Sequence, residues 1–268
     1  MNPAALTPPM TTAYTPLPNT FRRDILASRK LIGCWSSLTS PVTMEILGIA
    51  GFDWLLLDTE HAPNDLQSLM LQLMALKDSA SAPVVRPPSN DAVFIKRLLD
   101  LGFVNLLVPM IESAEEARRA VAATRYPPQG MRGVSGVQRC NRYGSQPDYA
   151  AQINDNVCVL LQIESRGGVA ALDQILAVPG VDGIFVGPSD LSAAYGHFGE
   201  PNHPEVQGVI AEVHARTRAA GKAAGILTTV EADAQRYIAQ GFQFVAVGSD
   251  QTLFRAVTQG LRDRFSSD

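Results

Sequence analysis

The sequence has few lysines and no basic cluster. Lys and Arg together number 22 among 268 residues, against 26 Asp and Glu, so the formal net charge is -4. A protein that binds nucleic acid needs a dense Lys/Arg surface to neutralise phosphates. The composition therefore argues against a nucleic-acid partner.

Cysteines and long apolar runs are also scarce. Cys34, Cys140 and Cys158 form no CxxC pair, which argues against a disulfide framework and a zinc motif. No run approaches the roughly 20 apolar residues that span a bilayer. Residues 1–20 contain no Lys or Arg and no apolar core of a signal peptide, so we expect a flexible N-terminal arm on a cytoplasmic protein with reduced thiols.

Common nucleotide and hydrolase motifs are missing as well. No GxGxxG follows a predicted strand, and neither GxxxxGK[ST] nor GxSxG occurs. Dinucleotide, P-loop and nucleophile-elbow chemistry are therefore unsupported.

The sequence does contain a regular alternation of apolar, strand-like runs with helix-like segments. Such alternation predicts a parallel sheet built from βα units. The predicted strands are 31–37, 53–61, 83–86, 105–110, 157–164, 183–190, 223–228 and 244–248. Eight strands, each followed by a helix, predict a single α/β domain over residues 21–268, a (β/α)₈ TIM barrel. The polar segment 125–150 is longer than an ordinary connection and is either a functional cover or disordered.

Polar residues concentrate where the predicted strands end, which is where such barrels place their chemistry. These positions include Asp58 to His61, Arg86, Pro109, Gln162, Glu164, Ser189, Asp190, Thr228, Ser249 and Asp250. Lys30, Lys77, Lys96 and Lys222 all lie elsewhere. A Schiff-base mechanism needs a lysine at this rim, so the pattern favours metal-based activation.

Two carboxylates, Glu164 and Asp190, end neighbouring predicted strands with no His or Cys at ligand spacing. Oxygen ligands of this kind suit Mg²⁺ or Mn²⁺ more than zinc. Gln162 precedes Glu164 by two positions and points to the same side of the strand. The alternative is that Glu164 caps a helix or pairs with Arg166.

His61 and Arg86 are the other candidates for chemistry. His61 stands at a strand end beside two acids, where a base that titrates near neutrality is useful, although an ordinary loop histidine remains the alternative. Arg86 ends an apolar run, and its guanidinium needs a partner such as a substrate carboxylate or a developing oxyanion.

Several stretches together resemble the HpcH/HpaI family of class II pyruvate aldolases. They are GFDWLLLDTEHAPND, PVVRPPSNDAVFIKRLLDLG, TRYPPQGMRGVS, VLLQIES, GVDGIFVGPSDLSAA and FVAVGSD, and the resemblance extends from about residue 21 to 265. IGCWSSLTSP and GILTTVEADAQRY are similar to a subgroup that cleaves 2-keto-3-deoxy sugar diacids to pyruvate and tartronate semialdehyde.

The resemblance implies a role for each matching residue. It implies that His61 is the base, that Arg86 stabilises the enolate and that Asp100 raises the basicity of His61. It further implies a divalent metal, Mg²⁺ first with Mn²⁺ or Co²⁺ as alternatives, held by Glu164 and Asp190, with Gln162, Ser189 and Asp190 contacting the pyruvate part. Thr59 departs from the family's usual Gly, and we expect it to narrow the site.

The resemblance also implies a homo-oligomer, a hexamer in which the last helix packs on a neighbouring chain. Its ligands are a 2-keto acid and an aldehyde. Three alternatives remain open: an aldolase of the family acting on another 2-keto-4-hydroxy acid, a related CoA-ester lyase or phosphoenolpyruvate-mutase-like enzyme, and a non-catalytic barrel subunit.

Overall fold

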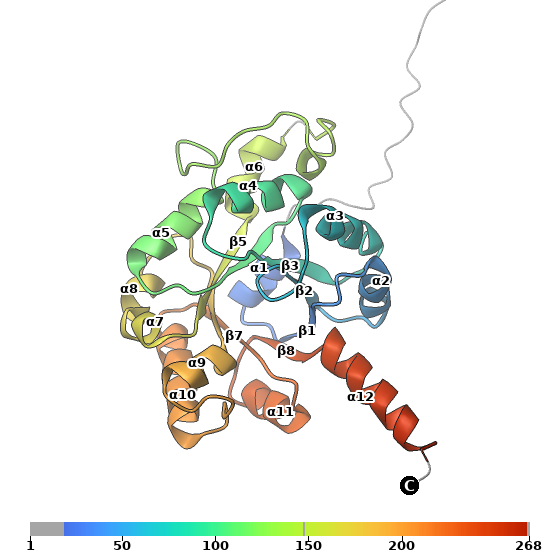
Figure 1. Ribbon diagram of the computed structural model, residues 1–268. Coiled ribbons are helices and arrows are strands. Elements are labelled where there is room, and N and C mark those ends of the chain that lie inside the picture. The colour runs from blue at the N-terminus through green and yellow to red at the C-terminus, as the bar shows by residue number, and fades with distance from the viewer. Residues whose placement is uncertain (1–18, 147, 267–268) are drawn as a thin grey trace, which may run out of the picture.

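Eight parallel strands form a closed barrel in the order of the sequence, and helices surround it (Figure 1). The computed structural model describes residues 19–146 and 148–266. The strands are β1 (Leu31–Ser36), β2 (Trp54–Asp58), β3 (Ala82–Arg86), β4 (Asn105–Val108), β5 (Cys158–Ile163), β6 (Gly183–Val186), β7 (Ala223–Leu227) and β8 (Phe244–Ser249). The predicted (β/α)₈ barrel is confirmed.

The helices lie between and after these strands. They are α1 (Thr20–Leu26), α2 (Pro41–Ile49), α3 (Leu66–Ala75), α4 (Ala92–Leu101), α5 (Ala114–Ala123), α6 (Tyr149–Asn156), α7 (Arg166–Ala170), α8 (Leu172–Leu176), α9 (Pro188–Ala194), α10 (Pro204–Ala219), α11 (Glu231–Ala239) and α12 (Asp250–Asp263), with a 3₁₀ turn at Arg139–Asn141. No helix in the described ranges combines the length and apolarity needed to cross a membrane.

Large aromatic side chains fill the inside of the barrel. Trp54 and Phe244 are buried there with ring centroids 6.0 Å apart. Each ring lies over a glycine: a Cβ on Gly33 would come within 2.2 Å of Trp54, and one on Gly225 within 2.2 Å of Phe244. The interior is therefore a packed core rather than a pore.

Helix α1 packs against the same aromatic core. The Phe21 ring centroid lies 6.1 Å from those of both Trp54 and Phe244, and the Asn19 amide donates to Asn105 Oδ1 at the start of β4 over 2.7 Å. The sequence pattern predicted no helix here. Most of the predicted arm, residues 1–18, lies outside the described residues, but Asn19 caps α1 and Thr20 begins it.

Two predicted strands end at least three residues earlier than expected, and four others end one or two residues earlier. Strand β2 ends at Asp58, which leaves Glu60 and His61 in the bend that follows. Strand β6 ends at Val186, and Ser189 and Asp190 lie in the first turn of α9 instead. Pro188 explains the second difference, because its fixed φ suits the first helical position.

Two neighbouring polar residues mark the start of α3. Asp65, not Asn64, caps α3, by accepting from the Ser68 N–H. Asn64 lies one residue before the cap, and its side-chain amide donates to the Asp58 carbonyl over 2.7 Å. It therefore fastens the end of β2 to the start of α3.

The long segment after α5 packs on the outside of the barrel against α4. Its anchor is Arg132, whose side chain is fully buried and donates to Asp100 over 2.9 Å. The same guanidinium lies 4.4 Å from the Tyr126 ring centroid. Since Asp100 is near the C-terminal end of α4, the segment covers that helix end and not the mouth where the strands end.

Helix α12 extends away from the barrel (Figure 1). Asp250 ties its first turn to the end of β1, accepting from Ser36 Oγ over 2.9 Å and from the Leu38 N–H over 3.0 Å. Beyond that turn the helix exposes the apolar side chains Leu253, Phe254, Val257 and Leu261, followed by Phe265.

Candidate active site

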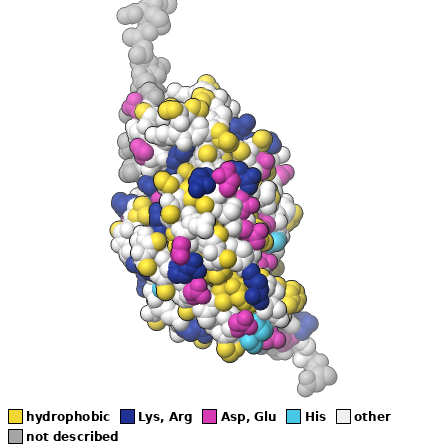
Figure 2. All heavy atoms as spheres, turned by 90° about the vertical axis from the view of Figure 1, so that its left-hand side faces the viewer, with side chains coloured by type: hydrophobic (Ala, Val, Ile, Leu, Met, Phe, Trp, Pro, Cys, Tyr) yellow, Lys and Arg dark blue, Asp and Glu magenta, His cyan; other side chains and the backbone are white. Residues whose placement is uncertain are grey.

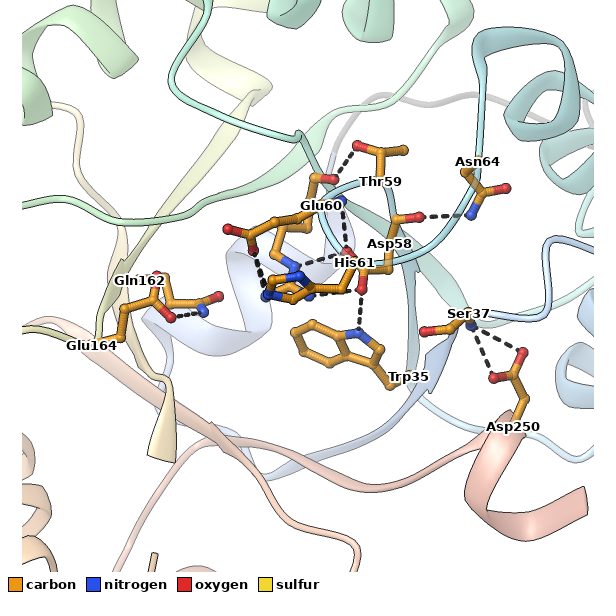
Figure 3. A network of polar contacts seen from close by, with 11 residues as sticks. Trp35, Ser37, Asp58, Thr59, Glu60, His61, Asn64, Gln162, Glu164 and Asp250 are labelled. Carbon is orange, nitrogen blue, oxygen red and sulfur yellow. Dashed lines mark hydrogen bonds and ion pairs between the residues drawn. The ribbon is translucent and has the colours of Figure 1, made fainter. Parts of the chain in front are cut away.

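A cavity of about 310 Å³ opens where the strands end. It is lined by Trp35, His61, Arg86, Gln162, Phe185, Gly187, Pro188, Ser189, Asp190 and Leu227. Five predicted site residues, from β3, β5, α9 and the bend after β2, are thereby brought together. Figure 3 shows Glu60 and His61 on the side of their segment that faces Gln162 and Glu164.

Arg86 is buried between two acids and an aromatic ring. Its guanidinium donates to both oxygens of Asp58 over 2.9 and 2.7 Å, and lies 4.8 Å from the Trp35 ring centroid. Burial alone would raise the pKa of Asp58, but the hydrogen bonds and charge of Arg86 hold that pKa below its ordinary value. From the sequence, the Arg86 guanidinium was expected to need a partner such as a substrate carboxylate. Its main partner is instead Asp58, within the protein.

Glu60 connects Arg86 with His61. Its Oε2 lies 2.7 Å from Arg86 Nη1, an ion pair without good hydrogen-bond alignment, and 3.8 Å from His61 Nε2. Burial raises the pKa of Glu60 despite the opposing charge of Arg86, and the nearby charges of Asp58 and Asp190 act in the same direction as burial. The His61 side chain is 66% exposed, so the imidazole is open to a molecule in the cavity.

Glu164 lies behind the cavity lining, in contact with Gln162. Gln162 Nε2 donates to Glu164 Oε2, and the Met110 N–H donates to Glu164 Oε1 over 2.8 Å. Burial raises the pKa of Glu164 to about 7; the two hydrogen bonds lower it, whereas the negative charges of Asp190 and Glu60 raise it further. The alternatives for Glu164 are excluded: Ser165 caps α7, and Arg166 donates to the Ala194 carbonyl.

The donor set fits a hard divalent cation. The negative charge of Asp190 raises the pKa of both Glu60 and Glu164, and that of Glu60 also raises the pKa of Glu164, so a cation among the three carboxylates would relieve repulsion. Gln162 Oε1 is a buried oxygen with no hydrogen-bond partner. A Cβ on Gly187 would lie 2.6 Å from Glu164 Oε2, so only glycine leaves this carboxylate its space. Such oxygen ligands are those that Mg²⁺ prefers.

Asp100 does not join this group within one chain. It lies on α4, which returns the chain from the end of β3 to the start of β4, so its last turn is at the opposite mouth of the barrel from His61. Its described partner is Arg132. Among the described residues, no hydrogen bond or ion pair joins Asp100 to His61.

Sequence reasoning missed the aromatic and aliphatic lining of the cavity. Trp35, Phe185 and Leu227 come from β1, β6 and β7, and within these apolar runs nothing distinguishes them from core residues. Thr59 was expected to narrow the site, but its side chain is buried and its hydroxyl donates to the Arg86 carbonyl. The branched residue thus fastens the end of β2 to β3 and does not line the cavity.

Comparison with known proteins gives a consistent result. Residues 31–256 match the family model described as HpcH/HpaI aldolase/citrate lyase. Curated 5-keto-4-deoxy-D-glucarate aldolases from Salmonella paratyphi C and Citrobacter koseri are each 60% identical to this chain over 248 residues. The matched region is 92% of this chain, 97% of the Salmonella protein and 96% of the Citrobacter protein. The crystal structure of an HpcH/HpaI aldolase/citrate lyase family protein from Burkholderia cenocepacia is 40% identical, with a TM-score of 0.89, and covers 92% of this chain and 100% of its own.

Proposed function

Because the chain belongs to the HpcH/HpaI aldolase/citrate lyase family, we propose that it is a metal-dependent class II aldolase. Its proposed reaction is the reversible cleavage of 5-keto-4-deoxy-D-glucarate, or 2-dehydro-3-deoxyglucarate, to pyruvate and tartronate semialdehyde. The 60% identity to curated aldolases of that name supports the substrate. The observation on which the chemistry rests is one cavity bordered by His61, Arg86, Gln162, Ser189 and Asp190.

Glu164 and Asp190 are the proposed metal ligands. A divalent cation, Mg²⁺ in our proposal, would supply Lewis-acid activation of the keto group there. Gln162 holds the Glu164 carboxylate in place by its hydrogen bond. Ser189 and the Asp190 backbone are in the first turn of α9, where N–H groups without helical partners suit the carboxylate of a bound 2-keto acid.

His61 is the proposed base for proton transfer, and Arg86 is proposed to stabilise negative charge. In cleavage, His61 accepts the proton of the C4 hydroxyl, whose oxygen becomes the aldehyde carbonyl as the C3–C4 bond breaks. The electron pair of that bond moves to the pyruvate part as an enolate, which becomes pyruvate when C3 takes up a proton. Arg86 stabilises the enolate oxygen with the part of its guanidinium that its two acids do not use. Asp58 and Glu60 keep that guanidinium in position.

The proposed role of Asp100 requires a second copy of the chain. Asp100 and His61 are at opposite mouths of one barrel, so Asp100 can raise the basicity of a histidine only across an interface. The exposed apolar face of α12 supports an oligomer, because patches of this kind usually mark protein–protein contacts. We propose a homohexamer, in line with the family resemblance, in which α12 packs on a neighbouring copy.

A pyruvate-release assay tests the proposal. Purified enzyme is incubated with 5-keto-4-deoxyglucarate, 4-hydroxy-2-oxoheptanedioate and 2-keto-3-deoxyrhamnonate, with and without Mg²⁺. We expect the first substrate to give the highest kcat/KM and chelation to abolish activity. Preference for another substrate would mean that the enzyme releases a different aldehyde. Full activity after complete metal removal would refute the metal mechanism.

Variants separate the proposed roles. Glu164→Ala and Asp190→Ala should abolish activity through loss of the cation, while His61→Ala should lower kcat by about 10² to 10⁴ with Mg²⁺ affinity unchanged. The control is Asp173→Asn, which changes an exposed side chain on α8 and should leave activity as in the wild type. A His61→Ala enzyme with near-normal kcat would exclude His61 as the base.

A further inference from the structure

Outside the cavity, the loop between α9 and α10 brings together three potential metal ligands. His197 and His203 lie in this loop, and Glu205 is in the first turn of α10. One ligand atom from each can be chosen so that all three lie within 4.8 Å of one another. We propose that His197, His203 and Glu205 form a second metal site, which takes a borderline transition metal such as Zn²⁺.

The distances need only a small adjustment. Zinc–nitrogen and zinc–oxygen bonds of about 2.0–2.2 Å imply donor atoms roughly 3.3–3.6 Å apart around a tetrahedral ion. His197 Nε2 is now 2.7 Å from Glu205 Oε2, and the His203 Nδ1 accepts from the Glu205 N–H over 3.3 Å. The hydrogen bond between His197 and Glu205 would be exchanged for bonds to the cation, with water in the fourth position.

The loop backbone already holds the two imidazoles together. Their ring centroids are 3.4 Å apart, with an interplanar angle of 15°. The His197 N–H donates to the Ser192 carbonyl over 2.8 Å and the His203 N–H to the Glu200 carbonyl over 2.9 Å. Because the lone pair of an imidazole nitrogen lies in the plane of the ring, the two side chains would have to rotate out of this stack to bind one ion. The loop backbone, held by these hydrogen bonds, would stay in place.

The charge of the cluster also suits a cation. Two neutral imidazoles and one carboxylate carry a net charge of about -1. Arg166 contributes positive potential, but its Nε donates to the Ala194 carbonyl over 2.8 Å and its guanidinium lies 4.1 Å from the Tyr195 ring centroid. No ion pair joins Arg166 to Glu205 among the described residues. In Figure 2, histidine side chains lie against acidic ones at the lower end of the face shown.

The two proposed sites differ in chemistry and place. Imidazole ligands suit zinc, copper and nickel, whereas the carboxylate and amide oxygens of the catalytic cavity suit Mg²⁺. His197, His203 and Glu205 do not line that cavity. Helix α9 connects them, because it contains Asp190 in its first turn and accepts the His197 N–H near its end. A cation at the loop would therefore fasten α9 to α10.

Zinc binding to the full chain tests this inference without measuring activity. The background is Glu164→Gln/Asp190→Asn, which removes the proposed oxygen ligands of the cavity. Metal-free protein is titrated with Zn²⁺ by calorimetry and with Co²⁺ by visible absorption. We expect one equivalent to bind, the Co²⁺ spectrum to be that of a tetrahedral ion, and Zn²⁺ to raise the Tm.

Single changes in the same background identify the ligands. His197→Ala, His203→Ala and Glu205→Gln should each weaken Zn²⁺ binding at least about 10-fold, while Glu200→Gln, in the same loop, should leave it unchanged. Circular dichroism of each variant checks the fold. If a histidine variant fails to fold, the Zn²⁺ affinity of Glu205→Gln decides whether the cluster binds the ion. Zinc binding that all three changes leave unaltered, or an octahedral Co²⁺ spectrum, overturns the inference.

Discussion

Arg86 is a buried charge held in place by two acids. Asp58 binds it through two hydrogen bonds, and Glu60 approaches from the side of His61. Asp58 is fully within the protein, whereas Glu60 is closer to the cavity and its pKa is raised by burial. The two acids thus differ: Asp58 fixes the guanidinium, and Glu60 links it to the exposed imidazole.

Asp58→Asn should destabilise the fold by about 3 kcal/mol at pH 7, because Arg86 would lose the main partner of a buried ion pair. The folded-state pKa of Asp58 is below its unfolded value. The pair therefore contributes fully to the free energy of unfolding above the unfolded pKa of about 3.9. This contribution is lost as the pH falls through the lower pKa of the folded state. Urea unfolding between pH 7 and pH 3 measures the difference between the two proteins.

That difference should shrink towards pH 3. The control is Asp173→Asn, which removes the exposed partner of Arg216 and should cost less than about 1 kcal/mol at any pH. An Asp58→Asn penalty that stays constant from pH 7 to pH 3 would contradict this account of the pair.

Gly187 lies against the proposed metal ligand. Gly187→Ala would put a methyl group 2.6 Å from the present position of Glu164 Oε2, so this carboxylate must move. We expect Mg²⁺ affinity to fall by about 10- to 100-fold, measured by calorimetry and by the Mg²⁺ dependence of kcat. Gly208→Ala is the matched control, since nothing lies within 4 Å of its Cβ and α10 should gain about 0.5–1 kcal/mol.

At the scale of elements, α12 differs from the other long helices. Its polar first turn is tied to β1 by Asp250, but most of its apolar side chains face solvent. Helix α2 also exposes Val42, Ile46 and Ile49. A second copy could cover both surfaces, which explains why the sequence keeps them apolar.

Val257→Asp on α12 should dissociate the proposed hexamer. Val257 is 69% exposed in one chain, so an aspartate costs little in the monomer but leaves a charge without a partner in a packed interface. Light scattering should report a smaller particle, with secondary structure unchanged by circular dichroism. Gln259→Glu tests whether any added charge on α12 acts in this way. An unchanged particle mass for Val257→Asp would exclude this face from the interface.

At the scale of the molecule, the barrel separates Asp100 from His61. Helix α4 returns the chain to the mouth where strands begin, while the bend after β2 lies where strands end. A monomer therefore cannot bring the two side chains together, and an assembly can do so between copies.

Complementation tests that arrangement. Asp100→Ala and His61→Ala should each be nearly inactive alone, but coexpressed chains should assemble with about a quarter of the sites native in both residues. Pyruvate release from the copurified mixture, with one variant tagged, measures the recovery. A further variant, Arg132→Lys, tests whether the ion pair with Arg132 also holds the Asp100 side chain in position. Mixtures no more active than the better single variant would mean that the two residues do not share a site.

The order of elements and the polar rim followed from the sequence alone. Alternating apolar runs and helix patterns are local signals, and eight repeats of them leave a closed barrel as the natural arrangement. Glu164, Arg86 and Gln162 were found because polar residues at the carboxyl ends of parallel strands must meet at one mouth.

Tertiary structure decided which groups face one another. Pairing of Arg86 with Asp58, the position of Asp190 in α9 and the cluster around His197 depend on contacts between elements. Asp100 is the clearest case, because its sequence motif implies a partner that the path of α4 keeps at the opposite mouth. Local periodicity specifies elements, whereas distances between them are set only when the barrel closes and its side chains pack.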